Sequence, residues 1–290
     1  MVVFFVDHPA YHHPTIRAPL PRLHASFPTA HHLDFCRRFL RDDIALAHLP
    51  HATADAAAAP WQDRDIPLFL SASVLADPEP FRAQWQQHGA EVAARLNAIV
   101  EAHDAAPTRP LHEHVLDALG GAVPPLEILA SYVITVDTYL RSRIKRDLAA
   151  ALLHLPLLVC GEGWRGMAPA DGRAKFMGPV PAAETIALMR RARIVLNPLP
   201  PYYESHERPL QAMVNGAVAA NGPSAFLAAA FPGGYLPLPA VPQEAAAVLE
   251  AALEDEERLS TVAAAGHASC RAAHLWDHRA SAILRFAASA

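Results

Sequence analysis

The stretch IVLNPLPPYYESHERPLQAMVNGAVAAN, residues 194–221, contains the pattern that decides the fold prediction. Its first four residues, Ile194–Asn197, form a short apolar run that is typical of a buried strand. A helix is predicted over 209–215, because proline is favoured at the first helical position, and a second strand is predicted over 217–221. Short strands that alternate with helices predict a parallel sheet with helices on both faces.

The same alternation continues on both sides of this stretch. Further strands are predicted over 65–73 and 155–160, and further helical segments over 79–153, 182–192 and 243–290. The last segment has a predicted break at Gly266. We therefore expect an α/β architecture in which residues 63–290 form a doubly wound, Rossmann-like domain with a helical insertion.

Residues 1–62 are predicted to form a separate and smaller α/β portion. Strands are expected over 2–6 and 44–49, a helix over 29–39, and an alanine-rich linker over 52–59. About 60 residues are too few for a complete Rossmann domain, since domains usually have roughly 100 to 150 residues. We interpret this portion as a short or truncated N-terminal unit.

Composition excludes several classes of protein. The 290 residues carry 24 Lys+Arg and 29 Asp+Glu, a net charge of −5, so the basic footprint of a nucleic-acid-binding protein is absent. No apolar run reaches the roughly 20 residues of a membrane-spanning helix. Residues 1–6 are apolar without a preceding basic segment, which disfavours a signal peptide and predicts a cytoplasmic protein. Cys36, Cys160 and Cys270 are expected to be reduced and buried.

Two loops after predicted strands are candidates for binding an anion. Gly161 and Gly163 follow one strand and would let main-chain amides approach a ligand, although a common tight turn explains them equally well. The segment from Asn197 to Gly216 leads into a helix whose free N–H groups suit a diphosphate, with Arg208 beside them. A solvated polar loop that caps the helix is the alternative.

The order of motifs over residues 155–284 resembles the donor-binding half of GT-B glycosyltransferases, in particular the group 1 or CgeB-like branch. The resemblance is carried by Phe176–Pro181, Glu184, Leu188–Ala192, Ile194–Asn197, Glu204–Gly216 and His274–Ala280. It implies a nucleoside-diphosphate sugar as donor, used as substrate rather than cofactor. It also implies that neither a metal nor another cofactor is required, because the helix end and basic side chains stabilise the leaving diphosphate.

The resemblance also assigns roles to individual residues. It implies that the turn at Gly178 holds the nucleotide base, and that Gln211 stands where relatives carry a glutamate for the ribose. The arginine and lysine pair that many relatives place on the first strand is missing, and Ser71, Ser73, Arg165 and Lys175 are the expected substitutes. The predicted donor-binding residues are Ser73, Gly161, Gly163, Gly178, Val180, Asn197, Tyr203, His206, Glu207, Arg208, Gln211 and Asn215.

Asp7, His8 and Glu204 are the candidate catalytic residues. Asp7 and His8 follow the first predicted strand, where either side chain could take a proton from an acceptor hydroxyl; a helix cap formed by Asp-His-Pro is the alternative. Glu204 lies one residue away from the expected position of a family glutamate. The histidine pairs, including His112 and His114, lack the i, i+4 spacing of zinc hydrolases, so no metal site is predicted.

The sequence therefore predicts a hexosyltransferase-type enzyme that moves a sugar from a nucleoside diphosphate to a hydroxyl of a glycan or protein acceptor, as in bacterial glycan biosynthesis. Peripheral membrane association and the oligomeric state are left open. One alternative is a non-catalytic sugar-nucleotide-binding or interaction module that kept the donor fold. A second is an epimerase or hydrolase that uses the same cleft.

Overall fold

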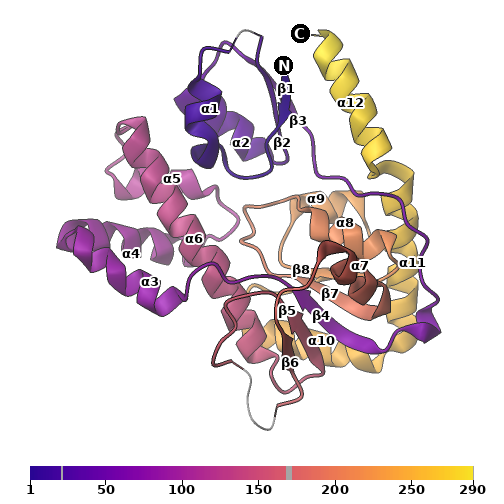
Figure 1. Cartoon of the computed structure of the whole chain (residues 1–290). Helices are drawn as coiled ribbons and strands as arrows, with labels where there is room; N and C mark the ends of the chain where they lie inside the picture. The colour runs from indigo at the N-terminus through magenta and orange to yellow at the C-terminus, as the bar shows by residue number, and fades with distance from the viewer. Residues whose placement is uncertain (21, 168–171, 290) are drawn as a thin grey trace.

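The computed structural model describes residues 1–20, 22–167 and 172–289, and it contains two parallel β-sheets (Figure 1). The first sheet lies in the N-terminal part of the chain and has three strands in the order β1-β2-β3. These strands are β1 (Val2–Phe4), β2 (His24–Phe27) and β3 (Ala45–His48). Around them lie η1 (Pro9–His12), α1 (His13–Arg17), α2 (Ala30–Phe35) and the π-helical turn η2 (Cys36–Leu40).

The second sheet has six parallel strands in the order β6-β5-β4-β7-β8-β9. Its strands are β4 (Ile66–Ser71), β5 (Leu157–Cys160), β6 (Lys175–Met177), β7 (Ala192–Asn197), β8 (Val218–Asn221) and β9 (Leu236–Pro237). Numbered within the sheet, this is the order 3-2-1-4-5-6 of a doubly wound fold, which reverses direction between β4 and β7. Such sheets bind ligands at the carboxyl ends of the strands beside that reversal.

The strands of the second sheet are apolar without alternation because both faces are covered. Leu68 and Leu70 face one hydrophobic cluster, whereas Phe69 between them faces another. The first cluster packs against α6 (Leu126–Ala151) and α10 (Pro242–Glu254), and the second packs against α7 (Ala182–Arg191), α8 (Glu207–Val214) and α11 (Glu256–Ala273). This arrangement confirms the predicted α/β fold with parallel sheets.

The segment between β4 and β5 is a helical insertion, as predicted. It consists of α3 (Pro78–Gln84), η4 (Trp85–His88), α4 (Ala90–Ala105), α5 (Leu111–Ala118) and α6. Its hydrophobic core also includes Ala10 and Phe35 of the N-terminal part and Tyr202 of the loop after β7. The insertion therefore packs against both of the sheet-containing parts of the chain (Figure 1).

The chain crosses between the two sheets at two places that lie side by side. Thr53, before η3 (Trp61–Asp63), forms an isolated parallel bridge with Leu275, which precedes α12 (Trp276–Ser289). α12 then returns to the first sheet, where the rings of Trp276 and Phe4 are 6.0 Å apart (Figure 1). The predicted boundary between residues 62 and 63 falls inside η3, and α12 of the predicted donor domain contacts the N-terminal sheet.

Most predicted elements are confirmed, and several details differ; α9 (Ala225–Ala230), for example, was not predicted. β2, β6 and β9 were missed because each is only two to four residues long. The predicted break at Gly266 is wrong: α11 runs through this glycine, where a Cβ would lie 2.3 Å from the carbonyl oxygen of Gly234. The glycine permits close packing instead of ending the helix. All three cysteines are free and buried, as expected. In the described part of the chain, no helix is both long and apolar enough to span a membrane.

Candidate functional site

The first turn of α8 lies directly after the loop that follows β7, beside the reversal in strand order. The helix begins at Glu207, two residues earlier than predicted, and His206 is its N-cap. The Nδ1 atom of His206 accepts a hydrogen bond from the main-chain N–H of Arg208, and Pro209 has no N–H to offer. The first-turn N–H groups that could still face a ligand are therefore those of His206 and Glu207, because the first N–H groups of a helix have no partner within it. This end of α8 offers fewer main-chain donors to an anion than the sequence suggested.

Arg208 extends from α8 toward the carboxyl end of β7. Its Nη1 donates to Oδ1 of Asn197 over 2.6 Å, and Nδ2 of Asn197 donates to Oδ1 of Asn221 at the end of β8 over 2.6 Å. Burial lowers the pKa of Arg208 to about 10, so the guanidinium stays positively charged at neutral pH. Its hydrogen-bond partner Asn197 is neutral.

Two further cations reach this region from α6, which the sequence analysis did not include in the site. Lys145 is 6% exposed, and its Nζ donates to the main-chain oxygen of Ser73 over 2.8 Å. Burial, together with the charges of Arg141 and Arg208, lowers the pKa of Lys145 to about 8. Arg141 and Lys145 are four residues apart and share one face of α6. That spacing was visible in the sequence, but nothing in it located this helix beside α8.

A cavity of about 130 Å³, the smaller cavity, lies where the N-terminal part, α6 and α8 meet. It is lined by Val6, Asp7, His51, Arg141, Leu199, Tyr203, His206 and Glu207. Arg141 donates to Oδ1 of Asp7 over 3.3 Å at this point. The smaller cavity thus brings a carboxylate of the N-terminal part next to the first turn of α8.

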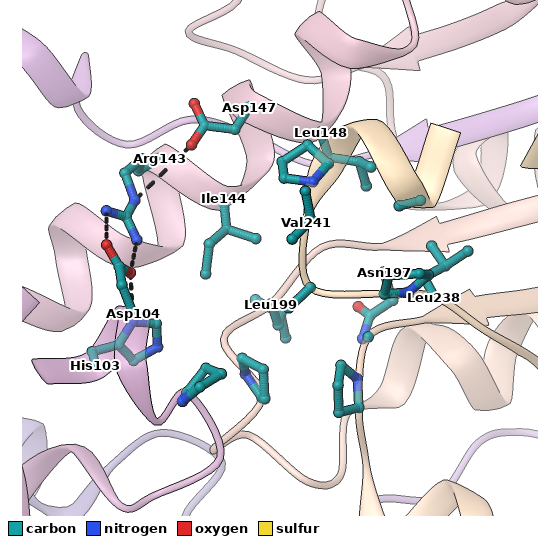
Figure 2. Close-up of a pocket in the computed structure, with 18 residues that line it drawn as sticks. His103, Asp104, Arg143, Ile144, Asp147, Leu148, Asn197, Leu199, Leu238 and Val241 are labelled. Atoms are coloured by element: carbon teal, nitrogen blue, oxygen red, sulfur yellow. Dashed lines mark hydrogen bonds and ion pairs between the residues drawn. The ribbon is translucent and has the colours of Figure 1, made fainter. Parts of the chain in front are cut away.

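A second cavity of about 370 Å³, the larger cavity, lies between the helical insertion and the carboxyl ends of β7, β8 and β9 (Figure 2). Ile144, Leu148, Leu199, Leu238 and Val241 contribute aliphatic side chains, and five prolines complete much of the wall. The prolines are Pro107, Pro201, Pro223, Pro239 and Pro242. Such a wall suits an uncharged ligand rather than a phosphate group.

The charged side chains of the larger cavity are paired with one another. Arg143 forms ion pairs with Asp104 and, over 4.0 Å, with Asp147, as Figure 2 shows. The three charges sum to −1, and no cation in the described lining is left for an anionic ligand. Leu199 lines both cavities, so they lie on either side of the loop after β7.

A buried carboxylate on α6 joins three parts of the fold. Asp137 is fully buried and accepts hydrogen bonds from the hydroxyls of Tyr11 and Tyr202, each over 2.8 Å, and of Tyr203 over 3.1 Å. Burial raises the pKa of Asp137, while Arg141 and the tyrosine hydroxyls oppose this effect. Tyr203, a predicted donor-binding residue, therefore uses its hydroxyl to hold the loop after β7 against the insertion.

The three candidate catalytic residues have different surroundings. Asp7 lines the smaller cavity, whereas His8 is 3% exposed and its Nδ1 accepts from the main-chain N–H of Ala10. His8 thus caps η1, which was the alternative interpretation of this segment. Glu204 lies 3.6 Å from Nε2 of His31 and lines neither cavity.

The glycine turn after β5 packs closely against the segment that follows β4. Gly161 and Gly163 have φ of +132° and +83°, and Cβ atoms there would lie 2.1 and 2.2 Å from the carbonyl oxygens of Ala72 and Val74. The N–H of Gly161 donates to the oxygen of Gly178, and the N–H of Glu162 donates to Oγ of Ser73. A protein partner therefore already uses the N–H of Gly161, one of the two glycines that the sequence assigned to a ligand.

The remaining predicted donor contacts are spread along α7 and α8. Val180 packs against the hydrophobic cluster on the α7 and α8 side of the sheet. Gln211 lies in the second turn of α8. Asn215 is the C-cap at the opposite end of this helix. Its Nδ2 donates to the main-chain oxygen of Gln211, and its main-chain oxygen accepts from Arg64. Lys175 opens β6 and so lies away from the carboxyl edge. Asn215 and Lys175 therefore do not join the cluster around Arg208.

These features define a protein with a fold of the GT-B glycosyltransferase class. They are the two parallel sheets, the strand order of the second sheet and the group of cations at the point where that order reverses. Residues 141–285, half of the chain, match the family model described as glycosyl transferase-like. The chain belongs to this glycosyl transferase-like family. No curated protein shows significant sequence similarity to it.

Solved structures agree with the class of fold. Sucrose-phosphate synthase from Thermosynechococcus elongatus is 12% identical with a TM-score of 0.52, and the match covers 100% of this chain and 74% of that one. TarM is 8% identical with a TM-score of 0.52, covering 91% of this chain and 43% of TarM. The Anabaena protein HepE, in complex with UDP-glucose, is 13% identical with a TM-score of 0.45, covering 100% of both chains. The chain thus spans less than half of TarM.

Proposed function

We propose that this chain transfers a sugar from a nucleoside-diphosphate donor to a hydroxyl acceptor, and that the diphosphate binds beside Arg208, Lys145 and the first turn of α8. The observation that carries the proposal is a pair of cations without carboxylate partners, of which Lys145 is buried and Arg208 is half-buried. Arg208 donates to an amide oxygen and Lys145 to a main-chain oxygen. In the described part of the chain, neither forms an ion pair. Buried charges are normally paired, so a dianionic ligand would complete this site.

The same two cations supply what a leaving diphosphate requires. As the bond between sugar and phosphate breaks, negative charge grows on the phosphate oxygens, and Arg208 and Lys145 are positioned to stabilise it. Arg141 lies in the same region, where it pairs with Asp7 and Asp137. We therefore propose a reaction that needs no metal ion. Asn197 would orient Arg208 in this role.

Asp7 is the proposed general base. Its carboxylate lines the smaller cavity opposite Glu207 of α8, so an acceptor hydroxyl placed there would meet both the base and the donor sugar. A base within about 3 Å of the hydroxyl supports an inverting transfer. The larger cavity is the proposed place for the uncharged body of the acceptor, because its wall is apolar and its charges are internally paired.

The finer assignments follow from the resemblance in the sequence. The segments Phe176–Pro181 and His274–Ala280 support a place in the CgeB-like branch, with residues 1–62 on the acceptor side and 63–290 on the donor side. Gly178 and Gln211 are the proposed contacts to base and ribose. A glycan or protein acceptor in bacterial glycan biosynthesis and a cytoplasmic location complete this proposal. The alternative is a binding module that retains the donor site without transferring sugar.

Donor binding is the first test. We expect nucleoside diphosphates to raise the melting temperature of the protein, and Arg208→Ala to weaken their binding by the roughly 1.5 to 3 kcal/mol of a charge-assisted hydrogen bond. Arg258→Ala, an exposed arginine on α11, is the matched control and should bind as the unmodified protein does. A panel of nucleoside diphosphates that gives no shift at millimolar concentration would refute the proposal.

Turnover separates the transferase from the binding module. The transferase should release sugar from a donor when acceptor is present, and Asp7→Asn should abolish this release while leaving the nucleotide-induced shift intact. Nucleotide binding without any sugar release, across a panel of acceptors, would favour the module. Unchanged turnover in Asp7→Asn would remove Asp7 from the role of base.

A further inference from the structure

A histidine and two carboxylates from distant parts of the sequence meet between α2 and α5. Asp34 lies on α2 of the N-terminal part, whereas His112 and Glu113 lie on α5 of the insertion. One potential ligand atom from each of these three residues lies within 4.8 Å of the other two. This group could not be predicted from the spacing of His112 and His114, because Asp34 is far away along the chain.

His112 provides an observation that is independent of the acidic residues. Its side chain is 1% exposed, and neither ring nitrogen has a hydrogen-bond partner among the described residues. Nε2 is directed at the two carboxylates, 3.9 Å from Oδ2 of Asp34 and 3.5 Å from Oε1 of Glu113. A buried polar nitrogen without a partner is costly, so this arrangement calls for a group that can bond to it. A neutral imidazole carries a lone pair on one of its two ring nitrogens, and this nitrogen can bind a metal ion.

The carboxylates already share a cation. Nη1 of Arg38 donates to Oδ2 of Asp34 over 3.0 Å and also to Oε1 of Glu113. These are the same two oxygens that face His112. Neither ring nitrogen of His112 receives a hydrogen bond from this guanidinium. The single positive charge of Arg38 also leaves the two carboxylates with a net charge of −1. The Arg38 side chain is 42% exposed and can therefore turn into solvent.

The spacing of the ligand atoms also suits a small divalent ion. Ligand atoms about 2.0 to 2.2 Å from a tetrahedral zinc ion lie about 3.3 to 3.6 Å from one another. The separation of 3.5 Å between His112 and Glu113 is in this range, and the 3.9 Å to Asp34 is close to it. One neutral imidazole and two carboxylates would neutralise a divalent charge, with water as a fourth ligand.

We propose that Asp34, His112 and Glu113 form a binding site for a divalent transition-metal ion of the zinc class, with Arg38 as an internal competitor. Because its ligands come from α2 and α5, the bound ion would clip the N-terminal part to the helical insertion. None of the three residues lines either cavity. The role is therefore structural, separate from sugar transfer, and independent of the proposed function.

Zinc titration against a competing chelator tests the site, and melting temperature reports its effect on stability. We expect the unmodified protein to bind zinc at one site. In His112→Ala, the zinc affinity of this site should fall by roughly tenfold or more. His114→Ala is the matched control on the same helix. His114 is also buried, but its Nε2 contacts the oxygen of Ala106, so its substitution should leave this affinity unchanged. Arg38→Gln should tighten zinc binding, because the competing cation is removed.

The opposite results would overturn the proposal. Equal zinc affinities in His112→Ala and His114→Ala would mean that only adventitious histidines bind the ion, as would an Arg38→Gln variant that binds no more tightly. If His112→Ala does not fold, Asp34→Asn and Glu113→Gln replace it, since both side chains reach solvent. Retention of full affinity in both of those variants would equally refute the site. Co²⁺ in place of zinc should give the visible absorption of a tetrahedral complex in the unmodified protein and not in Asp34→Asn.

Discussion

Replacing Lys145 by methionine should stabilise the protein and at the same time weaken donor binding. Folding lowers the pKa of this lysine from 10.5 to about 8, which corresponds to roughly 3 kcal/mol of destabilisation at pH 7. Methionine has a similar length and carries no charge, so the variant escapes this cost. It loses the hydrogen bond to the oxygen of Ser73, worth about 1 kcal/mol. The net gain is about 2 kcal/mol, or roughly 4 °C in Tm for a chain of this size.

The pH dependence gives the sharper test. The unfolded chain binds the proton of the Lys145 ammonium group more tightly than the folded chain does. The free-energy cost of burying this group is therefore fully present below about pH 8 and is lost as pH rises through 10.5. The stability advantage of Lys145→Met should therefore shrink above pH 8 and reach zero within about half a pH unit of pH 10. Urea denaturation of the unmodified protein and the variant at pH 7, 8, 9 and 10 measures this difference directly.

Lys175→Met is the matched control, since these are the two lysines of the chain and Lys175 is exposed at the start of β6. The control should leave stability within about 0.5 kcal/mol at every pH. Nucleoside-diphosphate affinity should fall roughly 10- to 150-fold in Lys145→Met and remain unchanged in the control. A stability difference that stays constant from pH 7 to 10 would show that the ammonium group is not the buried charge inferred here.

Two further substitutions test how the site is held in place. Gly161→Ala should lower stability by roughly 1 to 3 kcal/mol in urea denaturation, because φ is +132° and the new Cβ meets the oxygen of Ala72. Gly178→Ala is the control and should be nearly neutral, because there is open space around this glycine. Equal urea midpoints for the two variants would contradict the packing role of Gly161. Asp137→Leu should cost roughly 3 to 5 kcal/mol, because three tyrosine hydroxyls lose their buried acceptor. Combining it with Tyr202→Phe should cost less than the sum of the two single changes, whereas strict additivity would show that the carboxylate and hydroxyl do not interact.

The sequence predicted the four central strands of the second sheet, β5, β4, β7 and β8, because they are mainly apolar runs. Leu157–Cys160 and Ala192–Asn197 are buried on both faces, so local composition alone marks them as strands. The first sheet was harder, because β2 has the sequence HASF and gains its burial from the two strands beside it. β9, with two residues, exists only through its pairing with β8.

The candidate site was predicted in part, for reasons that depend on distance along the chain. Arg208 and Asn197 are 11 residues apart and were correctly placed together. Lys145 was missed, because its position depends on how the insertion packs and not on its own neighbours. Asp137 and Tyr11 are 126 residues apart, and no local pattern in a single sequence connects them. The start of α8 was misplaced because histidine, which caps it, is an uncommon N-cap.

The paired crossings between the two sheets limit how those sheets can move. The N–H of Thr53 donates to the oxygen of His274 over 3.0 Å, and the N–H of Trp276 donates to the oxygen of Thr53 over 2.9 Å. Two separate connections would permit swivelling in any direction, but two that are bonded together bend as one pivot. In the proposed transferase, this shared connection would limit the directions from which Asp7 could approach a bound nucleotide.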